Sequence, residues 1–179
     1  MAEEKKDPWL NYLALTTVIL ALCATLSTFK GGGFSTRSVL SQTQASDQWA
    51  YYQAKSIKGY LYELQKEKLE LELKLQGSKV PSSFMEEYQK KIDSYAKNIK
   101  RYNEEKAQIE KDARKFEAIK EDATKHAQAF GMAVMILQIA ILLSSIAALM
   151  KKKPVWILGL ILGAFGVVYF INGFLLFIK

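Results

Sequence analysis

Residues 127–150 read AQAFGMAVMILQIAILLSSIAALM, and residues 154–178 read PVWILGLILGAFGVVYFINGFLLFI after a short basic turn. Neither stretch contains Asp, Glu, Lys or Arg, and the same is true of residues 9–29. About 20 apolar residues in a helix cross the roughly 30 Å hydrocarbon core of a bilayer, and a run of about 18 or more predicts a spanning helix. The sequence therefore predicts three transmembrane helices, over 9–29, 127–150 and 154–178, and it excludes a soluble enzyme.

The second and third spans are joined only by Lys151, Lys152 and Lys153, and so short a connection predicts a hairpin of two spans. With three spans, the N-terminal tail (1–8) lies on the same side of the membrane as this basic turn (151–153). Five Lys occur among these eleven residues, and basic residues close to span ends favour the cytoplasm. We therefore expect the tail and the turn inside the cell and the charged middle of the chain outside.

The charged middle, residues 45–126, has the pattern of a helical hairpin. Apolar residues in its second half recur in alternating steps of three and four, which is typical of a coiled coil. These positions are Met85, Tyr88, Ile92, Tyr95, Ile99, Tyr102, Ile109, Ala113, Phe116, Ala123 and Ala127, with Lys106 and Lys120 between them. Ser83 and Glu86 have the spacing of a capping box, so we expect this helix to begin near them.

An upstream helix has the same spacing and ends before Gly77 and Pro81, which are typical of a turn. Its apolar positions are Ala50, Ala54, Ile57, Leu61, Leu64, Leu71 and Leu75, with Lys68 at one position of the series. We expect these positions to face the second helix. Residues 30–44 are rich in Gly and Ser, so we expect a linker there, with a hinge at 31–36. The predicted fold is an all-α membrane protein: three transmembrane helices with a long antiparallel coiled-coil hairpin inserted between the first and second.

Three further apolar side chains, Tyr62, Leu69 and Leu73, lie on the opposite side of the upstream helix. A helix with two apolar faces usually has two neighbours, so we expect the chain to self-associate through this second face. An aromatic group that includes Trp49, Tyr52 and Tyr60 precedes it. These rings either belong to that contact or form a ligand patch, and packing is the favoured interpretation.

Small and amide side chains stand out within the spans. Gly159, Gly163 and Gly166 have the spacing that lets helices approach closely in lipid, either within one chain or between two chains. Gln138 lies near the middle of its span, where an unpaired amide is costly, so we expect an interhelical hydrogen bond to Asn172 or to a Thr.

Chemistry-bearing residues are sparse. The chain has one Cys and one His, and no pair of side chains has the spacing of a metal site or of a nucleophile and its base, so we expect neither an enzyme nor a cofactor. Between residues 30 and 125 the chain has 19 Lys and Arg against 15 Asp and Glu, closely interspersed. That mixture is typical of a solvated helix rather than a nucleic-acid surface. Because no span contains an ionisable residue, a charge-coupled transporter is disfavoured.

Four segments carry a family resemblance: PWLNYLALTT (8–17), STFKGG (27–32), ASDQWAYYQAKSIK (45–58) and KKKP (151–154). They resemble a bacterial membrane-protein family that is catalogued only as a domain of unknown function (number 4337). The resemblance implies a bacterial inner membrane, and hence a periplasmic hairpin, but it implies no activity or site.

The function expected from these features is a structural or assembly module. It is in contact with membrane lipids, self-associates through the hairpin and the small-residue stripes of the spans, and has room for a protein partner on the hairpin. The alternative is a channel or transport subunit with a pore formed by the oligomer, bordered by Gln138, Asn172 and the glycines of the third span.

Overall fold

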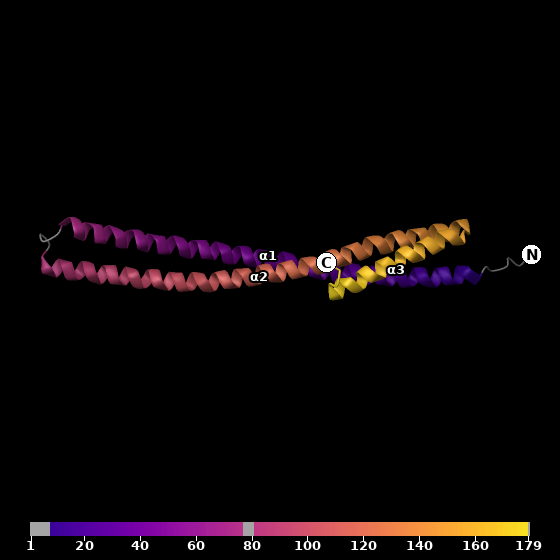
Figure 1. The fold of residues 1–179 in the computed structure, drawn as a ribbon, viewed down its shortest axis with the longest axis horizontal. Coiled ribbons are helices and arrows are strands. Elements are labelled where there is room, and N and C mark those ends of the chain that lie inside the picture. Colours follow the sequence, from indigo (N-terminus) through magenta and orange to yellow (C-terminus); the bar gives the residue numbers. More distant parts are fainter. Residues whose placement is uncertain (1–7, 77–80, 179) are drawn as a thin grey trace, which may run out of the picture. The chain divides into compact units, whose positions relative to one another are not determined.

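The computed structural model describes residues 8–76 and 81–178. Over these residues the chain forms three helices, α1 (Pro8–Gln76), α2 (Ser82–Met150) and α3 (Lys153–Leu175), and no strands (Figure 1). The prediction of an all-helical chain is confirmed. Each helix contains a segment that is long and apolar enough to cross a membrane. The predicted tail, except for its last residue, and most of the predicted turn after Gln76 lie outside the described residues.

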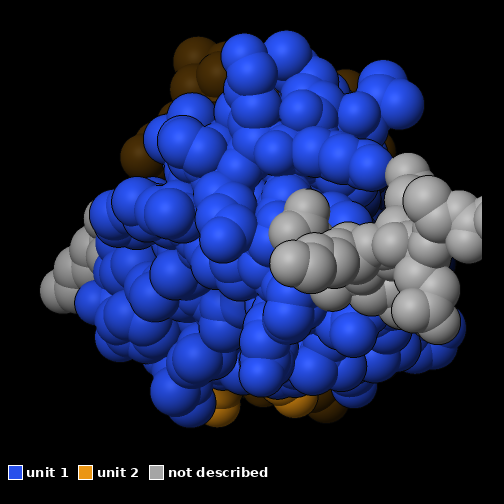
Figure 2. Space-filling model, turned by 90° about the vertical axis from the view of Figure 1, so that its right-hand side faces the viewer, with its two compact units in different colours: residues 1–40, 119–179 blue, residues 41–118 orange. Residues whose placement is uncertain are grey.

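The helices are divided between two compact units, coloured separately in Figure 2. Unit 1 contains residues 8–40 of α1, residues 119–150 of α2 and the whole of α3. Unit 2 contains the rest of α1 and α2, from Ser41 to Ala118. All three apolar segments belong to unit 1, and the charged segments belong mainly to unit 2.

Residues 30–44 are helical, so the prediction of a linker, and of a hinge at 31–36 within it, is wrong. A glycine inside a helix costs about 1 kcal/mol relative to alanine, but packing can outweigh this cost. A Cβ atom on Gly31 would lie only 3.0 Å from the Cβ atom of Phe130, so α1 and α2 approach closely here. One turn later, Phe34 stacks on His126 with ring centroids 4.4 Å apart. The segment in which a linker was expected thus packs against α2, and α1 continues through it as a helix.

The glycines of α3 lie against bulky side chains of the other two helices. A Cβ atom on Gly163 would lie 2.9 Å from the side chain of Leu20 on α1, and one on Gly166 would lie 2.7 Å from that of Leu137 on α2. Both distances are shorter than real Cβ contacts allow. At Gly166 the overlap includes Cγ of Leu137, so glycine is needed there for α3 to lie so close to α2, whereas at Gly163 only the terminal methyl groups of Leu20 would have to move.

Aromatic rings fill the other end of this interface. Phe130 on α2 is fully buried, and a Cβ atom on Gly173 would lie 2.6 Å from its ring. The ring meets Phe174 edge-on, with centroids 4.9 Å apart, and lies 6.0 Å from the ring of Phe34. Nδ1 of His126 is 2.8 Å from the carbonyl oxygen of Gly173. This cluster joins all three helices of unit 1.

The two ends of α3 follow from its sequence. Lys151 has a φ of 51°, which turns the chain sharply between α2 and α3, and Pro154 occupies the first turn of α3, where its missing N–H costs nothing. Leu176 takes the left-handed conformation that ends the helix, and its N–H donates to the Asn172 carbonyl at 2.8 Å. The helix therefore ends three residues before the predicted end of the span.

Helix α2 begins at Ser82, close to the predicted start. The backbone N–H groups of Phe84 and Met85 donate to the carbonyl of Pro81, at 3.0 and 3.2 Å. The side chain of Ser83 lies outside the described residues, and Glu86 forms an ion pair with Lys90 at 2.8 Å. The predicted capping box is thus untested on the serine side.

We predict that Gly166→Ala destabilises unit 1 by about 1–3 kcal/mol, the usual cost of overpacking, because the new methyl group overlaps Leu137. Gly33→Ala on α1 is the matched control, since a Cβ atom there has no neighbour within 4 Å. It should be neutral or stabilising, because alanine favours the helix. Thermal unfolding of both variants in detergent checks this, and equal midpoints would refute the close contact.

Candidate functional site

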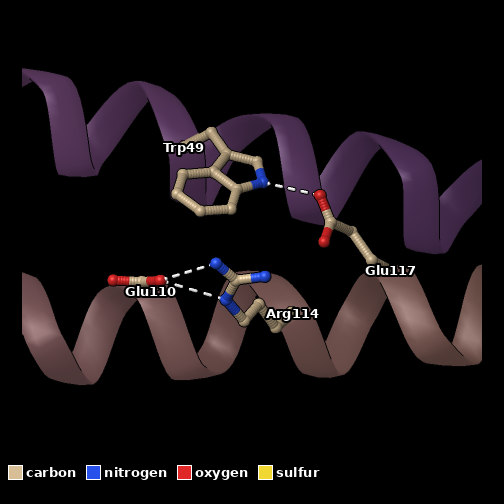
Figure 3. Close-up of polar contacts among 4 residues, drawn as sticks. All are labelled: Trp49, Glu110, Arg114 and Glu117. Atoms are coloured by element: carbon tan, nitrogen blue, oxygen red, sulfur yellow. Dashed lines mark hydrogen bonds and ion pairs between the residues drawn. The ribbon is translucent and has the colours of Figure 1, made fainter.

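Trp49 on α1 and the charged side chains of α2 form a polar and aromatic cluster within unit 2 (Figure 3). The indole Nε1–H donates to Oε1 of Glu117 at 2.8 Å. The Arg114 guanidinium lies 6.0 Å from the indole centroid, at the outer limit of a cation–π contact, and donates twice to Oε1 of Glu110, at 2.8 and 3.0 Å. Tyr52 meets the indole edge-on, with centroids 5.6 Å apart. Trp49 thus belongs to the helix–helix contact, and Tyr52 packs against it from the same helix.

A second polar contact of unit 2 lies closer to the C-terminal end of α1 than Trp49 does. Lys55 Nζ donates to Oε2 of Glu105 on α2 and lies 5.1 Å from the ring of Tyr51 and 5.4 Å from that of Tyr102. The hydrogen bond from Lys55 lowers the pKa of Glu105 below its ordinary value of 4.5. The same bond raises the pKa of Lys55 above its ordinary value of 10.5. The pair is therefore charged throughout the neutral range and fixes this point of α1 against α2.

The lowered pKa of Glu105 predicts a loss of stability in acid. A carboxylate whose folded pKa is depressed contributes stability above its unfolded value, and the contribution is lost as the pH falls through the folded pKa. We expect the unfolding temperature of the protein in detergent to fall less below about pH 4.5 in Glu105→Gln than in the unchanged chain. Glu104→Gln, which alters the exposed neighbouring residue, should retain the full decrease. Identical acid profiles for the two variants would contradict the role of this pair.

Tyr62 also faces α2, which reverses one sequence-based prediction. Its ring lies 5.8 Å from that of Tyr102 and 5.6 Å from that of Tyr95. Leu69 and Leu73, seven and eleven residues further on, are half-buried. The face predicted to be free for self-association is thus the face that contacts the second helix of the same chain, and that prediction is wrong.

The series predicted to face α2 is exposed instead. Its large members form a leucine stripe along α1 of unit 2, which consists of Ile57, Leu61, Leu64, Leu71 and Leu75. Their side chains are between 54% and 77% exposed. Both faces of this helix are apolar and share the same period, so spacing alone could not distinguish them. The signal that could have done so is the row of tyrosines on α2, which matches Tyr62 rather than the leucines.

On α2 most of the predicted positions are buried or partly buried, and Met85, the first of them, is 43% exposed. Ile92, Tyr102, Ile109, Ala113 and Ala123 all have less than a tenth of their surface exposed. The contacts of unit 2 pair Trp49 with Glu117, Lys55 with Glu105, and Tyr62 with Tyr102 and Tyr95. The residue number thus falls along α2 as it rises along α1.

Tyr60, the remaining predicted aromatic residue, is exposed, and Lys106 Nζ lies 5.6 Å from its ring. It therefore borders the helix pair without being enclosed by it. Among the aromatic candidates, only this ring is largely open to solvent next to the leucine stripe.

We predict that Tyr62→Ala destabilises unit 2 by about 1–3 kcal/mol, because it removes two ring contacts with α2. Leu61→Ala, at the adjacent exposed position, should change the stability by less than about 0.5 kcal/mol when the protein is dilute. The measurement is thermal unfolding followed by circular dichroism. A larger loss for Leu61→Ala would mean that the leucines face α2 after all.

In unit 1 the predicted packing residues are divided between the interior and the surface. Gly159, Gly163, Gly166 and Asn172 are buried inside the chain. Oδ1 of Asn172 accepts from the backbone N–H of Ile178 at 2.8 Å. Gln138, by contrast, is exposed on α2, so the predicted interhelical bond between the two amides is wrong.

In the part of the chain that the structure describes, no three His, Cys, Asp or Glu side chains lie close enough together to hold an ion. The side chain of His126 is 15% exposed. Its ring stacks on Phe34, and its Nδ1 lies within hydrogen-bond distance of the Gly173 carbonyl oxygen. Two apolar surfaces stand out among the described residues: the leucine stripe in unit 2 and the exterior of unit 1.

Residues 9–176 match the family described as Domain of unknown function (DUF4337). The chain belongs to the DUF4337 family. The resemblance noted in the sequence is thus confirmed, and it covers the membrane-length segments and unit 2 together. Comparison with curated proteins gave no match, and comparison with solved structures gave none either. DUF4337 brings no activity or site residue to this chain, so its function has to be argued from the two surfaces.

Proposed function

We propose that this chain is a non-enzymatic integral membrane protein that acts as an assembly module. Unit 1 is its anchor of three transmembrane helices, and unit 2 is an antiparallel coiled-coil hairpin outside the membrane that self-associates. In a bacterial inner membrane, the N-terminus and the Lys151 to Lys153 turn face the cytoplasm and unit 2 faces the periplasm. The exposed leucine stripe is the observation that carries the proposal.

The surface of unit 1 supports the membrane anchor. Its interior is built from glycine, alanine and serine at many helix contacts, while Leu15, Leu22, Leu142, Ile161 and Phe165 are about half exposed or more. Large apolar side chains on the outside and small ones at the contacts suit a lipid environment, where helices attract each other by close packing. In water the same surface would favour aggregation.

The leucine stripe supports self-association of unit 2. Its members keep the alternating steps of three and four, so they form one seam along the exposed side of α1. A second copy of the chain offers an identical seam, and pairing the two would remove both from water. Lys68 lies within this seam and is paired with Glu72 at 3.9 Å. A single Lys in such a seam sets the register at some cost in stability.

The channel alternative assigns the pore to Gln138, Asn172 and the glycines of α3. Of these, the glycines and Asn172 are buried between helices of one chain, and Asn172 already has a backbone partner. A pore bordered by them would require unit 1 to repack. The assembly module needs no such change.

We predict that Leu61→Glu combined with Leu64→Glu lowers the oligomeric mass of the detergent-solubilised protein, because four or more carboxylates would be brought together in the paired seams. The matched control is Ala96→Glu combined with Ala107→Glu, which adds the same charge at exposed positions of α2. Multi-angle light scattering measures the mass, and circular dichroism verifies that both variants keep their helices. An unchanged mass in the leucine variant, with full helicity, would refute the proposed seam.

A further inference from the structure

Gln138 is the polar side chain whose place in unit 1 is least compatible with lipid. It lies 11 residues after the first residue of the predicted span 127–150 and 12 residues before the last, which is the middle of the membrane. The residues of α2 that are buried in unit 1 include Leu137, Ala140 and Ser144. Gln138 is on the other side of the helix, exposed.

An amide at this depth needs a partner. It has two N–H donors and a carbonyl acceptor, and hydrocarbon offers no group to satisfy them. The other polar side chains of this span differ in this respect: Ser144 donates to the Ala140 carbonyl at 2.9 Å, and Ser145 donates to the Ile141 carbonyl at 3.0 Å. A hydroxyl can bond to its own helix in this way, whereas the exposed amide of Gln138 is directed to the outside.

We propose that Gln138 pairs with Gln138 of a second copy of this chain, and that the exposed face of α2 in unit 1 is a transmembrane dimer interface. Two copies inserted in the same direction bring these residues to the same depth. A primary amide is self-complementary, since each one can donate to the carbonyl of the other. A two-fold axis beside α2 therefore gives each amide one donated and one accepted hydrogen bond.

The exposed residues around Gln138 have the spacing that such an interface requires. Exposed positions recur in steps of four and three along this face, at Gly131, Met135, Gln138, Leu142, Ser145 and Leu149. Gly131 and Ser145 are small and lie seven residues before and after Gln138, so they permit close approach on both sides of the amide. The alternate positions are Met and Leu, which supply apolar contact. A water-filled pore would need polar groups in their place, so the pattern favours a packed dimer.

This inference rests on the membrane anchor in the proposed function but is independent of the leucine stripe. The two surfaces lie in different units, and either can hold two copies together without the other. Each therefore requires its own test in the complete chain.

The first experiment is oxidative cross-linking in liposomes. We expect Gln138→Cys, in a Cys23→Ala background, to form a disulfide-linked dimer at least several times faster than Phe165→Cys in the same background. Phe165 is the matched control because it is exposed near the middle of the third span, on α3. Equal rates at the two positions would overturn the proposal, since random collision gives that result.

The second experiment measures dimerisation in liposomes by energy transfer between labelled copies. We expect Gln138→Leu to weaken the dimer by about threefold to thirtyfold, the range measured for single polar contacts between membrane helices. Gln138→Asn retains an amide and should recover part of the loss, whereas Ile139→Leu at the adjacent exposed position should cause none. Unchanged dimerisation in Gln138→Leu would refute the role of the amide.

A third arm separates this inference from the proposed function. If the introduced thiols at position 138 still cross-link in the Leu61→Glu, Leu64→Glu background, the transmembrane interface stands without the hairpin seam. If alkaline carbonate strips the protein from the liposomes, Gln138 is not in lipid, and the membrane anchor and the interface are both refuted.

Discussion

The packing of unit 1 depends on glycine at the positions where α3 meets α1 and α2. At Gly166 even the backbone nitrogen of Leu137 would lie 3.2 Å from an added Cβ atom, so rotation of the leucine side chain would not remove the contact. Because the contact face of α3 is glycine, its bulky residues lie on the other faces, as Ile157 and Ile161 do. The need for glycine at the helix contacts therefore explains both the small side chains inside unit 1 and the large apolar side chains on its surface. Lipid tolerates this distribution, because association there depends on close approach and not on hiding large side chains.

The same constraint explains why the linker prediction failed. Three successive glycines and several serines are locally unfavourable in a helix, and by propensity alone they indicate a break. Gly31, however, admits Phe130 to within contact of the α1 backbone, and Ser38 bonds to Thr124 at 2.8 Å on the same side. The sequence of residues 30–44 is typical of a flexible segment, whereas in the fold its small side chains let α2 approach closely. The two possibilities can be told apart only when the neighbouring helix is known.

Sequence alone predicted an all-helical chain, the location of its three apolar segments and most of the buried positions on α2. The sequence did not show which of the two apolar faces of α1 contacts α2, nor whether Gln138 points to the interior or to the surface of unit 1. The repeat of α1 shows that Leu61 and Leu64 share a face, but the position of that face depends on Tyr95 and Tyr102 on another helix. The prediction of a hydrogen bond from Gln138 to Asn172 was wrong for a related reason. The depth of Gln138 in the span follows from counting residues, whereas the direction of its side chain depends on how α2 packs.

The side of α1 that contacts α2 and the side that is exposed have different properties. The side turned to α2 carries directional contacts: the indole bond from Trp49 to Glu117, the ion pair of Lys55 with Glu105 and the stacked ring of Tyr62. Such contacts are satisfied at one register only, since a shift of a turn would separate donor from acceptor. Leu69 and Leu73, which lie on the same side, are half-buried, but apolar contacts of this kind distinguish registers poorly. The pairing of α1 and α2 is fixed by polar and aromatic groups, and the leucine stripe takes no part in it. The proposed assembly module requires such a division, because each hairpin must have one fold before two hairpins can match.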